Sequence, residues 1–405
     1  MTSRIEKATT FTPRQRALSL AALITTSFGV GLSFGIGFPL TALTFEAWHQ
    51  PEWMIGLAGA TPAIAVLIAL PVLPRLVARI GPVAAIAGGC IAGAFGFLAL
   101  YAFATPWAWI AIRLFMSAGF ALPWLAGETW MNAVAREETR GRVIALYAIA
   151  FFSGFAAGPS VLQTLGLVGF WPFLAGALGT ALAGVPIVLA RRLSPEFCHD
   201  GSWNFLWALR LAPAAMVGAF IGGFAEISNL SLIPNIALAA GWSQDAALNL
   251  LSVMTIGGIA LQFPIGWLSD KTSRFAVTMS LAIAFVGLSL ILLVALSAPP
   301  VASAIAFLLG GVVLGFYTVG LAIVGERVDV VDLAAANAAF LVMYQLGAIL
   351  GPVVAGIAMT SSPILGFFAT MVVLMTAGLG AVVFVEKRAR RNAVPNAAPS
   401  VRVRG

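Results

Sequence analysis

The sequence predicts an all-α integral membrane protein of twelve transmembrane helices, arranged as two pseudo-symmetric six-helix halves. Three observations predict this fold. Hydrophobic residues occupy 60% of the 405 positions and charged residues only 9%, which exceeds what the core of a water-soluble domain accommodates. Apolar stretches of about 20 residues, the length that crosses a bilayer core, recur along the chain. Matching motifs also recur in the two halves of the sequence.

The apolar stretches define the domain organisation. Residues 1–16 form a polar tail, 17–189 the first half, 190–207 a central loop, 208–385 the second half and 386–405 a basic tail. The apolar stretch after the first tail is too long for a signal-peptide core, so we expect no cleavage. The expected spans are 17–43, 54–73, 82–103, 107–130, 143–165, 169–189, 208–238, 247–268, 275–296, 301–324, 333–360 and 363–385.

The basic residues predict the orientation in the membrane. Of the 22 Lys and Arg residues, 21 lie in the tails or in and beside every second loop, with Arg210 at the start of the span 208–238, and only Arg113 lies deep inside an expected span. Lys and Arg near helix ends stay on the cytoplasmic side. We therefore expect a multi-pass protein of the bacterial inner membrane with both termini in the cytoplasm. Anionic lipid explains the net charge of +7, and no nucleic-acid partner is expected.

Two motifs repeat at an offset of 192 or 193 residues. The loop 266–274 reads Gly-Trp-Leu-Ser-Asp-Lys-Thr-Ser-Arg, and a related loop, Pro-Arg-Leu-Val-Ala-Arg-Ile-Gly, occupies 74–81. A Gly-Pro element recurs with the same spacing, as Gly154, Gly158 and Pro159 and as Gly347, Gly351 and Pro352. Pro39 and Pro234, 195 residues apart, form a third expected match. We predict that the Gly-Pro elements provide close helix packing and a hinge.

With these motifs the chain resembles the major facilitator superfamily along all twelve spans. The family signature Gly-x-Leu-x-Asp-Arg-x-Gly-Arg is matched by Gly266, Leu268, Asp270, Lys271 and Arg274. The first copy departs from it, since Ala78 replaces the acidic residue. The resemblance implies transport by alternating access around a central site. The stretches 128–132, 140–142 and 325–327 look like those of a poorly characterised efflux-like branch.

Two charged residues inside expected spans are candidates for function. A charge near the bilayer centre costs about 2.5–3.5 kcal/mol on insertion scales, yet Arg113 and Glu226 lie there. The repeat places apolar residues near Leu308 opposite Arg113 and Gly31 opposite Glu226. One interpretation is that Glu226 exchanges a proton while Arg113 modulates it or holds an anionic group. The alternative is structural, with Arg113 bonded to backbone carbonyls and Glu226 bonded to a polar side chain.

Two further acidic residues, Glu128 and Glu326, end the expected helices 107–130 and 301–324 on the cytoplasmic side. There they can pair with basic residues as gate latches. The alternative is ordinary interfacial ion pairs worth less than about 1 kcal/mol. The full predicted gate set is Arg79, Glu128, Arg142, Asp270, Lys271, Arg274, Glu326 and Arg327.

Polar and aromatic residues on the expected cavity-lining helices suit an amphipathic organic solute. Each of them also has the alternative role of bridging neighbouring helices. The predicted lining is Phe34, Trp124, Asn229, Gln262, Tyr317, Tyr344 and Gln345.

The preferred function is secondary transport of a small organic solute, with proton-coupled efflux as the leading version. Uptake of a metabolite or organic anion by symport is the alternative, and a membrane-embedded enzyme or receptor is a remote one. The nucleotide-binding motif Gly-x-x-x-x-Gly-Lys-Ser/Thr, His-Glu-x-x-His and Gly-x-Ser-x-Gly are all missing from the sequence, so we expect no enzymatic activity, cofactor or metal. The expected partners are the solute, protons and lipid, and the expected state is a monomer.

Overall fold

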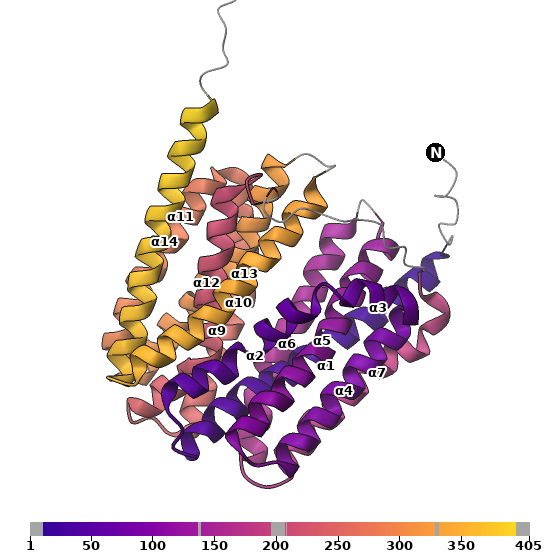
Figure 1. Cartoon of the computed structure of the whole chain (residues 1–405), viewed down its shortest axis with the longest axis horizontal. Coiled ribbons are helices and arrows are strands. Elements are labelled where there is room, and N and C mark those ends of the chain that lie inside the picture. Colours follow the sequence, from indigo (N-terminus) through magenta and orange to yellow (C-terminus); the bar gives the residue numbers. More distant parts are fainter. Residues whose placement is uncertain (1–10, 137–138, 196–206, 208, 329–331, 394–405) are drawn as a thin grey trace, which may run out of the picture.

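The computed structural model describes residues 11–136, 139–195, 207, 209–328 and 332–393 (Figure 1). Within these residues, twelve helices are long and apolar enough to cross a membrane. The expected tails and central loop lie largely outside the described residues. The first half contains α1 (Pro13–Ala47), α2 (Glu52–Ala69), α3 (Leu73–Ile80), α4 (Pro82–Ala102), α5 (Pro106–Val134), α6 (Arg140–Leu165) and α7 (Trp171–Leu189). A 3-10 turn, η2 (Arg191–Leu193), precedes the second half, which contains α9 (Pro213–Ala239), α10 (Gln244–Lys271), α11 (Arg274–Ala295), α12 (Pro299–Arg327), α13 (Leu333–Met359) and α14 (Pro363–Ala393).

Local sequence signals define several helix ends. At the start of α1 the Thr12 hydroxyl accepts a hydrogen bond from the Gln15 amide, and the Gln15 side chain accepts one from the Thr12 amide. This reciprocal pair satisfies two amides that have no partner inside the helix. Glycines with positive φ follow three helices, at Gly81 (82°), Gly166 (77°) and Gly241 (85°). A side chain at these positions would be strained, so the glycines allow the chain to turn.

The helix boundaries reproduce the internal repeat. Pro106 and Pro299 begin α5 and α12, 193 residues apart, and Glu52 and Gln244 begin α2 and α10, 192 apart. Contacts of α1 and α9, the first helices of the two halves, also repeat with this offset. A side chain at Gly31 would collide with the Phe151 carbonyl, and one at Gly223, 192 residues later, with the Tyr344 carbonyl.

This packing register corrects two expectations from the sequence. With an offset of 192, the counterpart of Glu226 is Phe34 rather than Gly31. Pro39 and Pro234, which are 195 residues apart, are not equivalent, because the offset of 192 places Ser231 opposite Pro39. The conclusion that Glu226 has no charged counterpart stands, since Phe34 is apolar.

The Gly-Pro elements lie where helices pack most closely. Side chains at Gly154 and Gly158 would collide with the backbone of α1, and side chains at Gly347 and Gly351 with the backbone of α9. The glycines therefore let α6 and α13 approach these neighbours, as small residues do in membrane helix pairs. Both helices continue through their prolines without a break. The hinge role stays a prediction.

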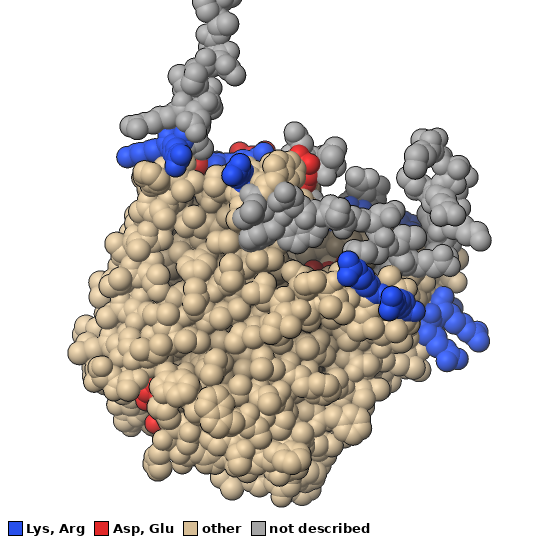
Figure 2. All heavy atoms as spheres, in the orientation of Figure 1, with Lys and Arg blue, Asp and Glu red and all other residues tan. Residues whose placement is uncertain are grey.

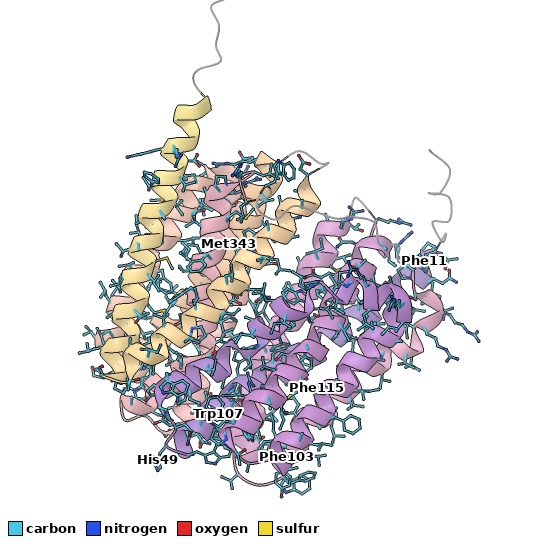
Figure 3. All side chains as sticks on the ribbon, viewed as in Figure 1. Phe11, His49, Phe103, Trp107, Phe115 and Met343 are labelled. Atoms are coloured by element: carbon cyan, nitrogen blue, oxygen red, sulfur yellow. The ribbon has the colours of Figure 1, made fainter. Side chains whose placement is uncertain are left out.

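The molecule has two chemically different ends. Lys and Arg side chains gather at the end where the described chain starts, at residue 11, and ends, at residue 393, toward the top of Figure 2; we call this the basic end. The opposite end carries short turns, and His49, Phe103 and Trp107 lie there (Figure 3). The short helix α3, which the sequence analysis treated as a loop, carries Arg75 and Arg79 at the basic end.

The two halves are joined toward the opposite end. Contacts between them run through α2 with α13, α6 with α10, and α1 with α9. Asn235 Nδ2 donates to Glu46 Oε2 at 2.9 Å, and Gln163 Nε2 donates to Asn249 Oδ1 at 2.8 Å. The hydrogen bonds that link the halves within the described chain all lie toward this end, and in Figure 1 the halves diverge toward the basic end.

Candidate functional site

Glu226 lies in the middle of α9 and is only 8% exposed. Its side chain lines a small pocket to which both halves contribute. The first half provides Phe152 and Phe155 of α6, and the remaining lining comes from α9, α10 and α12 as Leu230, Met254, Thr255, Gly310, Val313 and Leu314. Glu226 is thus a buried carboxyl at the boundary between the two halves.

The Tyr344 hydroxyl forms a side-chain hydrogen bond with the Glu226 carboxyl. The Tyr344 ring packs edge-on against Tyr317, with 5.3 Å between ring centroids. The same position of the first half holds Phe34 and Phe151, whose ring centroids lie 5.9 Å apart. The pair Phe34 and Phe151 in the first half thus corresponds to the pair Glu226 and Tyr344 in the second half. The two side chains contact each other in both halves, but the contact is polar only in the second.

Glu128 lies deeper in the fold than the sequence analysis expected. Helix α5 continues to Val134, so Glu128 lies about 9 Å, or nearly two turns, inside the helix end. The Trp124 indole donates to Glu128 Oε1 at 2.6 Å, and the Tyr147 hydroxyl packs over the neighbouring Gly127. The salt bridges of the described residues do not pair Glu128 with Arg79 or Arg142.

Tyr317 connects the surroundings of the two carboxyls. It lies on α12, within electrostatic range of both Glu128 and Glu226. In the repeat it is the counterpart of Trp124, 193 residues earlier. Trp124 and Glu128 of the first half therefore form one polar group, and Tyr317, Tyr344 and Glu226 of the second half form another, with an electrostatic interaction between Glu128 and Tyr317; we call the five residues the polar column.

Arg113 has an extensive set of hydrogen bonds within the first half. Its Nη1 donates to the Gly37 carbonyl at 3.0 Å and to the Thr41 hydroxyl at 2.8 Å. Its Nε contacts the Ala58 carbonyl and the Thr61 hydroxyl, both at 3.2 Å. These acceptors belong to α1 and α2, so the guanidinium ties both helices to α5. This arrangement matches the structural alternative considered for Arg113, and its role in modulating Glu226 or holding an anion stays a prediction.

We expect Arg113→Gln to lower the free energy of unfolding by about 3 kcal/mol, because several buried acceptors lose a charged donor. Arg113→Lys should recover only part of the loss, since an ammonium cannot reproduce the fork that reaches two helices. Thermal unfolding in detergent measures both changes. The exposed Arg192→Gln is the control, and equal melting of all variants would contradict the structural role.

The other predicted lining residues differ in their surroundings. Asn229 is 1% exposed and donates to the Ala225 carbonyl at 2.7 Å. Gln262 accepts a hydrogen bond from the Thr318 hydroxyl and donates to the Gly258 carbonyl. Gln345 is 5% exposed. Phe34 packs against Phe38, Phe120 and Phe151. Thr318 brings α12 to Gln262, which is a helix-bridging contact.

At the basic end, the predicted gate residues of the second half pair with one another. Arg274 lies 3.3 Å from Glu326 and 4.0 Å from Asp270. Lys271 is exposed. Arg327 instead forms two hydrogen bonds with Glu386 of α14, at 2.7 and 3.0 Å. Sequence reasoning missed Glu386, because 386 marked the first residue of the expected tail.

Three comparisons agree on the relationship of this chain to known proteins. The sequence matches the Major Facilitator Superfamily over residues 18–201 and 215–403. It is 29% identical over 336 residues to the uncharacterized MFS-type transporter YfkF of Bacillus subtilis, covering 80% of this chain and 85% of that protein. It is 26% identical over 328 residues to the MFS-type transporter YcaD of Salmonella dublin, covering 77% and 81%.

Solved transporters share the fold. The nucleoside transporter NupG superposes with a TM-score of 0.73 at 17% identity, covering 92% of this chain and 99% of that one. A bacterial homologue of the human lysosomal transporter Spinster, in an inward-facing and unoccupied conformation, gives a TM-score of 0.69 at 14% identity, covering 94% and 96%. With twelve membrane-length helices among its described residues and two repeated halves, the chain is a multi-pass membrane protein that belongs to the Major Facilitator Superfamily.

Proposed function

We propose that the protein is a proton-coupled secondary transporter that exports a small organic solute by alternating access. The observation that carries this proposal is the buried Glu226 carboxyl, which lines a pocket between the halves and bonds to Tyr344. A carboxyl there can bind and release a proton as its access changes, which links proton movement to the rocking of the halves. Its apolar counterpart Phe34 supports a function beyond scaffolding, because scaffold contacts recur in both halves.

The basic end is the cytoplasmic end in this proposal, since Lys and Arg face the cytoplasm in multi-pass proteins. The halves are joined toward the opposite end, so the described arrangement corresponds to an inward-facing state. Export then requires the joined end to open while the basic end closes.

Symport of an organic anion is the second candidate, and it needs a cation at the solute site. Arg113 is the buried basic side chain of the described residues. Its guanidinium already bonds to four acceptors on α1 and α2, which favours a structural role and therefore the export of a solute other than an anion.

The proposal is tested in two steps. Purified protein is melted in detergent with lipophilic cations, organic anions, sugars and amino acids, since ligands of the folded state raise its apparent stability. Each stabilising solute is then placed in proteoliposomes with an imposed pH gradient. We expect solute movement against its own gradient that stops when the pH gradient is collapsed. Movement that ignores the pH gradient would overturn proton coupling.

The hydrogen bond between Asn235 and Glu46, which links the halves at the joined end, gives a further prediction. Asn235 of α9 donates to Glu46 of α1 at 2.9 Å, and Asn235 is 2% exposed. Asn235→Ala should destabilise this closed end by about 1.5–3 kcal/mol, the worth of a hydrogen bond to a charged group. Fluorophores on cysteines at the exposed positions 79 and 271, in a background without native cysteines, should then move closer as the basic end closes. An unchanged distance distribution would contradict this role of Asn235.

A further inference from the structure

Two carboxyls reach the boundary between the halves from different positions of the repeat. Glu128 belongs to α5 of the first half and Glu226 to α9 of the second. Their counterparts are Leu321 and Phe34, which are apolar. Each half therefore contributes one carboxyl that its partner half lacks, and Tyr317 lies within electrostatic range of both.

Along the helices, aromatic side chains lie between the levels of these two carboxyls. With a rise of about 1.5 Å per residue, Glu128 lies about 9 Å from the basic end of its helix and Glu226 about 20 Å from the basic end of α9. Tyr317 and Tyr344 lie at intermediate depths of about 15–17 Å on α12 and α13. The Trp124 indole contacts Glu128, and the Tyr344 hydroxyl contacts Glu226. The polar column thus has a carboxyl at each end and aromatic rings between them.

The described residues provide no basic side chain that neutralises this column. Arg113 bonds to Gly37, Thr41, Ala58 and Thr61 near the joined end of the first half. The salt bridges of the described chain lie at the basic end and involve neither carboxyl of the column. Removing a carboxylate from water is costly unless it is protonated or paired. A bound cation would supply the pairing charge.

We propose that this column recognises an organic cation with apolar substituents, with its positive charge at Glu128 or Glu226 and its substituents on the faces of Trp124, Tyr317 and Tyr344. Aromatic faces attract cations, most strongly when water is excluded. The inference rests on the proposed transport function and names the substrate class of its central site. The carboxyl that does not contact the cation is free to hold the proton.

The test uses tetraphenylphosphonium as the cation and tetraphenylborate as an anion of the same shape. Equilibrium dialysis against the purified full-length protein gives the affinity for each. We expect tetraphenylphosphonium to bind, tetraphenylborate not to compete, and either Glu128→Gln or Glu226→Gln, whichever removes the carboxyl that contacts the cation, to weaken binding of the cation at least tenfold. Asp245 is an exposed acidic residue at the opposite end. Its variant Asp245→Asn should bind tetraphenylphosphonium with an affinity within twofold of that of the unaltered protein.

A variant that keeps both carboxyls guards against misfolding. Trp124→Phe removes the hydrogen bond that orients Glu128. It should lower the affinity for the cation several-fold while the melting temperature stays that of the unaltered protein. Equal binding of the borate, or unchanged cation affinity in all three column variants, would overturn the inference. A protein that moves another solute with the pH gradient but ignores the phosphonium would overturn only the substrate class. Binding of the phosphonium without transport under any gradient would overturn only the transport proposal.

Discussion

Glu226→Gln should abolish solute movement driven by a pH gradient in proteoliposomes. Glutamine has nearly the same shape as the carboxyl and still accepts the Tyr344 hydroxyl bond, but it cannot release a proton. The variant should therefore retain exchange of labelled for unlabelled solute when both sides hold saturating solute, because exchange needs rocking of the loaded protein and no net proton transfer. Measurement of gradient-driven transport and exchange on the same vesicles separates the two steps.

Two companion variants define the role of this carboxyl further. Tyr344→Phe removes one hydrogen bond to a charged group, which is worth about 1.5–3 kcal/mol, and should reduce gradient-driven transport tenfold or more without abolishing it. Asp245→Asn, an exposed carboxyl at the opposite end, is the matched control. Gradient-driven transport at the unaltered rate in Glu226→Gln would remove this residue from proton coupling.

Gly347→Val should prevent α13 from packing on α9 and cause a large loss of stability. A Cβ at Gly347 would collide with the Phe220 carbonyl. A backbone carbonyl cannot move aside as a flexible side chain can, so the helices must separate. We expect a loss of about 3 kcal/mol or more, at the upper end of overpacking effects, seen as low yield and a lower melting temperature in detergent.

Gly380→Val is the control for Gly347→Val. Gly380 lies in α14, and no atom approaches the position of its missing Cβ within 4 Å. Both variants make the same chemical change inside a helix, so their difference isolates the contact between helices. If the two variants melt together, the close approach of α9 and α13 is not a stabilising feature.

The sequence was sufficient to predict the membrane-spanning helices because lipid imposes a strong requirement on each span. Twelve expected spans correspond to the twelve long helices of the described chain. The register of the repeat was also readable from Gly154 and Gly347, where close packing requires glycine in both halves. Pro39 and Pro234 gave a wrong offset, because two equivalent helices can carry a proline at different turns while their packing faces stay in place.

The position of Glu128 was not predictable from hydropathy. The expected helix ended at 130, and the observed one ends at Val134. The additional turn was missed because polar residues at the end of an apolar stretch lower the hydropathy without breaking the helix. With this turn, the carboxyl lies inside the helix and not at its end. The joined end was not predictable either, because hydropathy does not reveal at which end the helices of the two halves contact each other. Contacts such as Asn235 with Glu46 show it in the structure.

Helix α14 offers a practical handle for imaging. It runs for 31 residues, Pro363–Ala393, or about 46 Å, which exceeds a hydrocarbon thickness of about 30 Å, and it projects beyond its neighbours (Figure 1). The paired bonds between Arg327 and Glu386 clamp it two turns before its end. A small folded protein fused in helical register after Ala393 would therefore be rigidly oriented, giving electron cryomicroscopy an alignment landmark outside the detergent micelle.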